Sequence, residues 1–94
     1  MFVATCVITL ELEGVHSLKE KRSIVKSLVV RLQREFNVSV AEVDGQDAWG
    51  TAIIGLAAVG NDKGYLHRLL EKSVAWVETH RPDVPIAAYS IEFW

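Results

Sequence analysis

The sequence has 94 residues, which is enough for one hydrophobic core and too few for two, so we expect a single domain over residues 1–94. Hydrophobic residues make up 50% of the chain and charged residues 23%, proportions that exclude a disordered or fibrous protein. The formal net charge of -2 excludes a positive field over the whole molecule. Any contact with nucleic acid must therefore depend on a local group of cations.

Cysteine content and hydropathy indicate the compartment. Cys6 is the only cysteine, so no intramolecular disulfide can form and a reducing compartment is sufficient. The first ten residues lack a basic leader, and no apolar run approaches the roughly 18 residues that span a bilayer. We therefore expect a cytoplasmic protein with no membrane partner.

The first half of the chain predicts a strand followed by a helix. Apolar residues alternate over residues 2–13, which is typical of a half-buried strand. Ser17 and Glu20 then have the spacing of a capping box, which predicts that a helix begins at Leu18. Apolar residues recur at spacings of three and four until the helix ends near Asn37, so one face of this helix should pack on a core.

The second half predicts a hairpin, a helix and a last strand. Residues 38–43 are rich in β-branched side chains, and a polar turn separates them from an apolar run between Trp49 and Val59. Asp62 is a cap residue before a second amphipathic helix, which the proline-containing segment 81–85 ends. Residues 86–94 alternate again, with Ala87, Tyr89, Ile91 and Phe93 on one face.

The predicted order β-α-β-β-α-β is that of the ferredoxin-like fold, an α+β sandwich in which both helices cover one face of a four-stranded antiparallel sheet. If even-numbered residues of the first strand face the helices, the opposite face is apolar and open. The residues expected there are Val3, Thr5, Val7, Thr9, Thr51, Ile53, Gly55 and Ala57. An exposed apolar patch of this kind marks an interface, so we expect a homodimer through the open sheet face.

Basic residues gather in the first predicted helix. Between His16 and Arg34 there are six basic residues and one acid, a net charge of +5, whereas the rest of the chain carries -7. A helical projection places Lys19, Arg22 and Lys26 within about 60° of one another, where they could bind phosphates together. A solvated helix face is the other interpretation. The candidate nucleic-acid-binding residues are Lys19, Arg22, Lys26, Arg31 and Arg34.

Lys21 falls inside the apolar arc of the same helix, where its ammonium must reach water or meet a carboxylate. Glu42 or Asp44 could supply that carboxylate, and we expect the two to share one face of the second strand. A structural pair is favoured over a catalytic lysine. The possible ligand or pairing site at the hairpin comprises Lys21, Glu42, Asp44, Gln46, Asp47 and Trp49. Its oxygen ligands lack the spacing of a recognised cation site, so we expect no metal.

No catalytic residue is predicted. The sequence contains no nucleophile elbow, no pair of cysteines and no glycine-rich phosphate loop, and its three histidines lack metal-ligand spacing. We therefore expect a non-enzymatic protein without a cofactor.

Three segments resemble the bacterial YlxP-like family, known as domain of unknown function 503. They are residues 16–22 (HSLKEKR), 37–49 (NVSVAEVDGQDAW) and 60–62 (GND). The resemblance extends over essentially the whole chain and implies a small cytosolic ferredoxin-like domain with no established activity. It also implies a gene that often lies beside those of translation initiation factor two and ribosome-binding factor A, and hence a role in ribosome assembly or translation.

Two functions follow as expectations, and an enzyme is a third and the least supported possibility, because no residue pair has both the chemistry and the spacing for a defined reaction. The first is an accessory factor that contacts ribosomal RNA, or a ribosome-associated protein, through the basic first helix. The alternative is a small regulatory or ligand-binding module, with a site at the 42–49 hairpin and the dimer interface.

Overall fold

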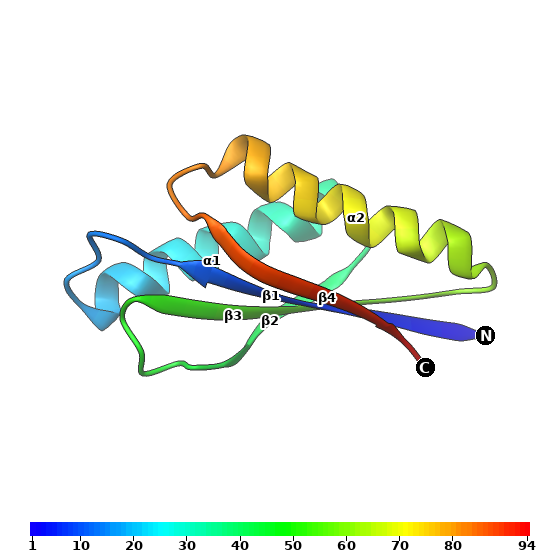
Figure 1. The fold of residues 1–94 in the computed structure, drawn as a ribbon, viewed down its shortest axis with the longest axis horizontal. Coiled ribbons are helices and arrows are strands. Elements are labelled where there is room, and N and C mark those ends of the chain that lie inside the picture. The colour runs from blue at the N-terminus through cyan, green and yellow to red at the C-terminus, as the bar shows by residue number, and fades with distance from the viewer.

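A computed structural model describes all 94 residues, and both helices lie on one side of a single sheet (Figure 1). The elements follow in the order β1 (Phe2–Glu11), α1 (Leu18–Glu35), β2 (Ser39–Asp44), β3 (Thr51–Gly60), α2 (Lys63–His80) and β4 (Ile86–Phe93). Antiparallel pairing arranges the strands as β2-β3-β1-β4. This arrangement confirms the predicted ferredoxin-like α+β fold.

The core lies between the helices and the two central strands. Even-numbered residues of β1 and β3 face it in register, so that Cys6 pairs with Leu56 and Ile8 with Ile54. The two helices cover these side chains with the apolar faces that their sequence periodicity predicts. The buried apolar residues of the helices are Val25, Leu28 and Leu32 of α1 and Leu66, Leu70, Val74, Trp76 and Val77 of α2. Neither helix combines the length and the apolar composition that crossing a bilayer requires.

Side-chain caps fix where both helices begin. The Ser17 hydroxyl accepts a hydrogen bond from the Glu20 backbone N–H at 3.1 Å, and the Glu20 carboxylate accepts one from the His16 N–H at 3.0 Å. Asp62 accepts from the Tyr65 N–H at 3.2 Å in the same manner. Each cap satisfies donors that the first turn of a helix leaves without a partner. The helices therefore begin at the predicted residues.

Two β-bulges break the alternation that the sequence suggests. In β2 the register shifts between Glu42, which pairs with Ile54, and Asp44, which pairs with Ile53. A bulge inserts one residue, so side chains beyond it change faces. Because Ile54 is buried in the core and Ile53 lies on the open face, Glu42 and Asp44 do not share a strand face, and that expectation was wrong.

The second bulge lies where β1 meets β4. The register shifts between Thr9 and Leu10, so that Thr9 pairs with Ala88 and Leu10 pairs with Ile86. Ile86 packs against the core, whereas Ala87 is exposed. The expectation that Ala87 continues the face of Tyr89 was therefore wrong, because the inserted residue shifts the pattern by one.

The N-cap of α1 gives the first testable prediction. Ser17→Ala removes the acceptor of the Glu20 N–H, so we expect the free energy of unfolding to fall by about 1 kcal/mol in urea titrations. The matched control is Ser27→Ala on the exposed side of α1, which should leave stability unchanged or raise it by a few tenths of a kcal/mol, since alanine is the better helix former. Equal effects at the two serines would show that the cap contributes nothing.

Candidate functional site

The basic flank, defined as Lys19, Arg22 and Lys26, lies on the solvent side of α1. All three residues are exposed, and none forms an ion pair with a carboxylate. At a rise of about 1.5 Å per residue, the flank spans roughly 10 Å along the helix. The structure thus brings three unpaired cations together on one surface of an otherwise acidic chain.

The other two candidate cations occupy different surroundings. The Arg31 guanidinium lies over the Trp76 ring of α2, 5.0 Å from its centroid, and Trp76 in turn stacks on His80 at 4.7 Å. Arg31 therefore points toward α2 and contributes a cation–π contact between the helices. Arg34 lies in the last turn of α1, where a positive charge interacts favourably with the helix dipole. Arg31 thus has a structural role, and both arginines lie beyond the basic flank along α1.

Lys21 is 1% exposed and points away from that flank into the protein. Its ammonium lies 3.1 Å from Glu42 Oε2 and donates a hydrogen bond to the carbonyl oxygen of Gly45 at 2.5 Å. Glu42 is thus the partner of Lys21, which was one of the two carboxylates that the sequence offered. Its Oε2 is buried without a hydrogen bond of good geometry, so the contact with Lys21 is an ion pair.

The Gly45 carbonyl is available to Lys21 because of a turn that favours glycine. Gly45 has a φ of +66°, and its N–H donates to the Asp44 carboxylate at 2.8 Å. Only glycine adopts this region of backbone space at no steric cost. Lys21 therefore ties the first turn of α1 to the end of β2 and to the turn that follows, which lie at the same end of the molecule (Figure 1).

The remaining hairpin candidates do not form a pocket. Asp44, Gln46, Asp47 and Trp49 are all exposed, and none of them lines a hollow in the surface. No three His, Cys, Asp or Glu side chains come together in a way that could hold a metal ion. The structure thus separates this group into a buried pair, Lys21 and Glu42, and four solvent-facing side chains.

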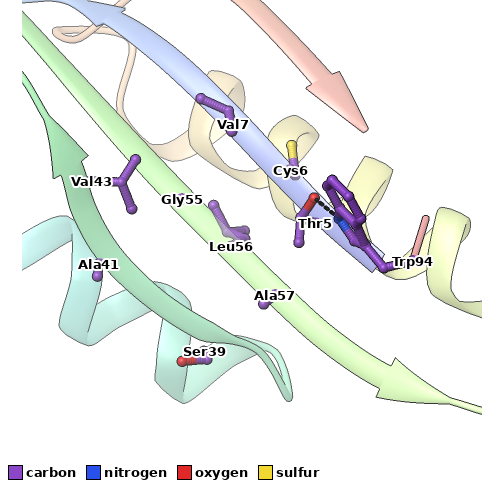
Figure 2. Close-up of a pocket in the computed structure, with 10 residues that line it drawn as sticks. All are labelled: Thr5, Cys6, Val7, Ser39, Ala41, Val43, Gly55, Leu56, Ala57 and Trp94. Atoms are coloured by element: carbon purple, nitrogen blue, oxygen red, sulfur yellow. Dashed lines mark hydrogen bonds between the residues drawn. The ribbon is translucent and has the colours of Figure 1, made fainter. Parts of the chain in front are cut away.

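The largest hollow lies on the open face of the sheet, away from the helices (Figure 2). It has a volume of about 480 Å³ and is mainly apolar. Its lining comprises Thr5, Cys6, Val7, Ser39, Ala41, Val43, Gly55, Leu56, Ala57 and Trp94. The sequence predicted Thr5, Val7, Gly55 and Ala57 on this face and Trp94 as a packing or interface residue. It did not place Trp94 or the β2 residues beside this hollow, because their positions depend on strand pairing.

Trp94 and Val43 stand on either side of this hollow (Figure 2). The Trp94 indole N–H donates to the Thr5 hydroxyl at 3.1 Å, which holds the ring over β1. Val43 lies over Gly55, where an added Cβ would come within 2.7 Å of its Cγ1. Glycine at this position therefore lets Val43 approach the backbone of β3 and shapes the hollow.

Cys6 is buried beneath this face and is not a nucleophile at neutral pH. Burial, with the nearby Glu71 carboxylate as a smaller cause, raises the pKa of its thiol to about 11. Because the thiolate is the reactive form, we expect the thiol to react slowly in the folded protein.

Comparison with known proteins places the chain in a family. The family model described as "Protein of unknown function (DUF503)" matches residues 3–91. The chain belongs to the DUF503 family. This confirms the resemblance carried by residues 16–22, 37–49 and 60–62, and it brings no established activity.

One relative and one solved structure illustrate the similarity of this DUF503 protein to others. The uncharacterized protein YlxP of Bacillus subtilis (strain 168) is 36% identical over 63 residues, 67% of this chain and 68% of that protein. The crystal structure of a putative chlorite dismutase has a TM-score of 0.53 and 18% identity, and it matches 99% of this chain. The chain spans only 44% of that larger protein, so the likeness shows the fold alone.

The buried pair gives a prediction about stability. Lys21→Met leaves the Glu42 carboxylate in a largely buried position without its cation, and we expect a loss of about 3 kcal/mol of unfolding free energy in urea titrations. Adding Glu42→Leu should recover most of that loss, because no buried charge then remains. Lys26→Met is the matched control and should change stability by less than about 0.5 kcal/mol. A double variant as unstable as Lys21→Met would contradict the ion-pair account.

Cys6 gives a prediction about reactivity. At pH 8 a native thiol with a pKa of about 11 should react with iodoacetamide far more slowly than the same thiol in urea-unfolded protein. Mass spectrometry of timed samples measures both rates. Similar rates in the two states would show that Cys6 is accessible in the folded protein.

Proposed function

We propose that this DUF503 protein is a non-catalytic accessory factor that binds ribosomal RNA through the basic flank of α1. The observation that carries the proposal is the exposure of Lys19, Arg22 and Lys26 without carboxylate partners. A cation that is already paired with a carboxylate releases no counterion when it meets a nucleic acid. A free cation does release one, and this release increases the affinity for the nucleic acid.

The position of the flank on the helix supports this function. Core-facing residues occupy one side of α1, and Arg31 faces Trp76 on the side toward α2. The basic flank occupies a remaining, solvent-facing side, so a polyanion can approach it without disturbing the core. Three adjacent cations suit the phosphate backbone, which is a sequence-independent target.

The open sheet face is a poor surface for RNA. Its side chains include no lysine, arginine or histidine, and Glu92 adds negative charge at its β4 edge. Aromatic side chains on the central strands, on which bases stack in sheet-based RNA modules, are absent from β1 and β3 of this face. We therefore assign the RNA contact to α1. The choice of ribosomal RNA as the target rests on the genomic neighbourhood that the family resemblance implies.

Charge reversal on matched helices tests the proposal. Arg22→Glu/Lys26→Glu should weaken binding of a fluorescein-labelled ribosomal RNA fragment at least about tenfold in anisotropy titrations, because two phosphate contacts are lost. Arg68→Glu/Lys72→Glu on α2 changes the net charge equally, also at exposed residues without ion pairs, and should have a much smaller effect.

The salt dependence gives an independent check. Three contacts with single-stranded RNA predict a slope of about -2 in log affinity against log salt, equivalent to roughly a 20-fold loss between 50 and 200 mM. Equal losses in both double variants would indicate a non-specific charge effect. Affinity that is insensitive to salt and to both double variants would exclude the basic flank as the binding surface.

A further inference from the structure

The sheet face opposite the helices is apolar, uncharged over its centre and covered by nothing in this chain (Figure 1). Val7 on the central strand β1 is 40% exposed, Val59 on β3 is 64% exposed and Trp94 is 71% exposed. Soluble monomers rarely leave such residues contiguous, so the face indicates an interaction surface.

This face has a raised part and a hollow part. The raised part is the Trp94 indole, which the Thr5 hydroxyl holds over β1. The hollow part is floored by the small residues Ala41, Gly55 and Ala57 on the β2 and β3 side (Figure 2). A large aromatic ring and a floor of small side chains are complementary shapes.

Strand register places the two parts at the same level of the sheet. Thr5, beneath the indole, pairs with Ala57 of β3, and Ala57 pairs with Ser39 of β2. The indole lies over β1, and the small-residue floor of the hollow lies across the boundary with β3, on the β2 and β3 side. A two-fold axis along the strands at that boundary would bring the indole of each copy onto Ala57 of the other, so the face is complementary to itself.

We propose that this face binds a second copy of the chain, forming a sheet-on-sheet homodimer in which each Trp94 packs into the partner's hollow. Aligned packing of two sheets about 10 Å apart is a standard way to bury such faces. The inference does not depend on the RNA proposal, because the basic flank and this face lie on opposite sides of the molecule.

The size of the face suits a second copy. Strands of ten, six, ten and eight residues, spaced about 4.8 Å apart and rising about 3.3 Å per residue, give a flat area of roughly 540 Å². Stable interfaces bury about 800 Å² of accessible surface per partner, and accessible surface exceeds flat area once side chains are included. One face of this sheet is therefore large enough.

The same features disfavour other occupants. A small-molecule site needs a few convergent polar groups, but here the Thr5 hydroxyl already accepts from Trp94 and the remaining lining is mainly apolar. An acidic partner or a nucleic acid would meet no cation on this face. Self-association uses both the ring and the hollow.

Sedimentation velocity and light scattering at micromolar concentration measure the mass directly. We expect twice the 10.5 kDa mass of one chain. Trp94→Lys and Ala57→Glu should each raise the dimer dissociation constant by about 30-fold or more, as expected when an interface hot spot is removed. Circular dichroism checks that both variants fold. Tyr65→Lys, which changes an exposed aromatic on the helix layer, is the matched control and should remain dimeric.

Mixing the variants tests the geometry itself. In a heterodimer of Trp94→Lys with Ala57→Glu, the new lysine of one chain faces the new glutamate of the other, and the second contact keeps its native tryptophan and alanine. The mixture should therefore recover dimers that neither variant forms alone. A wild-type protein that is monomeric would overturn the proposal. So would single variants that both remain dimeric, which is the result expected if the chains pair through the β4 edge. A mixture of the two variants that forms no dimers would also overturn it. A small molecule retained stoichiometrically by a monomer in native mass spectrometry would also overturn it.

Discussion

Two 18-residue helices cover a sheet whose central strands are ten residues long, and both helices pack their buried apolar residues on the same face of that sheet. This one-sided covering explains much of the chain. Most even-numbered residues of β1 and β3 are apolar and buried, whereas their odd-numbered neighbours, which include valine, threonine and alanine, are mostly partly exposed. The open face is therefore a consequence of the architecture, and its hydrophobicity is the basis on which we propose a partner.

Helix α1 separates its charged residues by direction. Lys21 projects into the protein toward Glu42, Arg31 lies over Trp76 of α2, and the basic flank faces solvent. Successive helical residues are rotated by about 100° about the helix axis, so residues close in sequence point in different directions and make different contacts. Of the cations concentrated in this segment, only those on the solvent side are available to bind a polyanion.

The Lys21 contacts link parts of the chain that lie 24 residues apart. A buried ion pair adds little net stability compared with apolar residues of the same volume. Lys21 instead fixes the position of the turn after β2. Its ammonium can contact both the Glu42 carboxylate and the Gly45 carbonyl only when that turn lies against the first turn of α1.

Local sequence patterns predicted the order of the elements, the first residues of the helices and the faces that pack on the core. Alternation in β1, the capping residues Ser17 and Asp62 and the helical period each depend on neighbours within about four residues, so they can be read along the chain. The same reasoning identified Lys21 as a cation in need of a carboxylate. It also singled out Lys19, Arg22 and Lys26 as one group, because a helix fixes their relative directions.

Features that depend on distant parts of the chain were decided only by the tertiary structure. The bulges near Asp44 and Ala87 shift strand register and change which side chains share a face, and the local pattern does not record such a shift. Trp94 reaches Thr5 across 89 residues, and Val43 lies over Gly55 of the next strand. Both contacts exist because strand pairing, a long-range interaction, sets which residues stand side by side. The sequence by itself determined the layers and the cations, and the pairing of strands determined the shape of the open face.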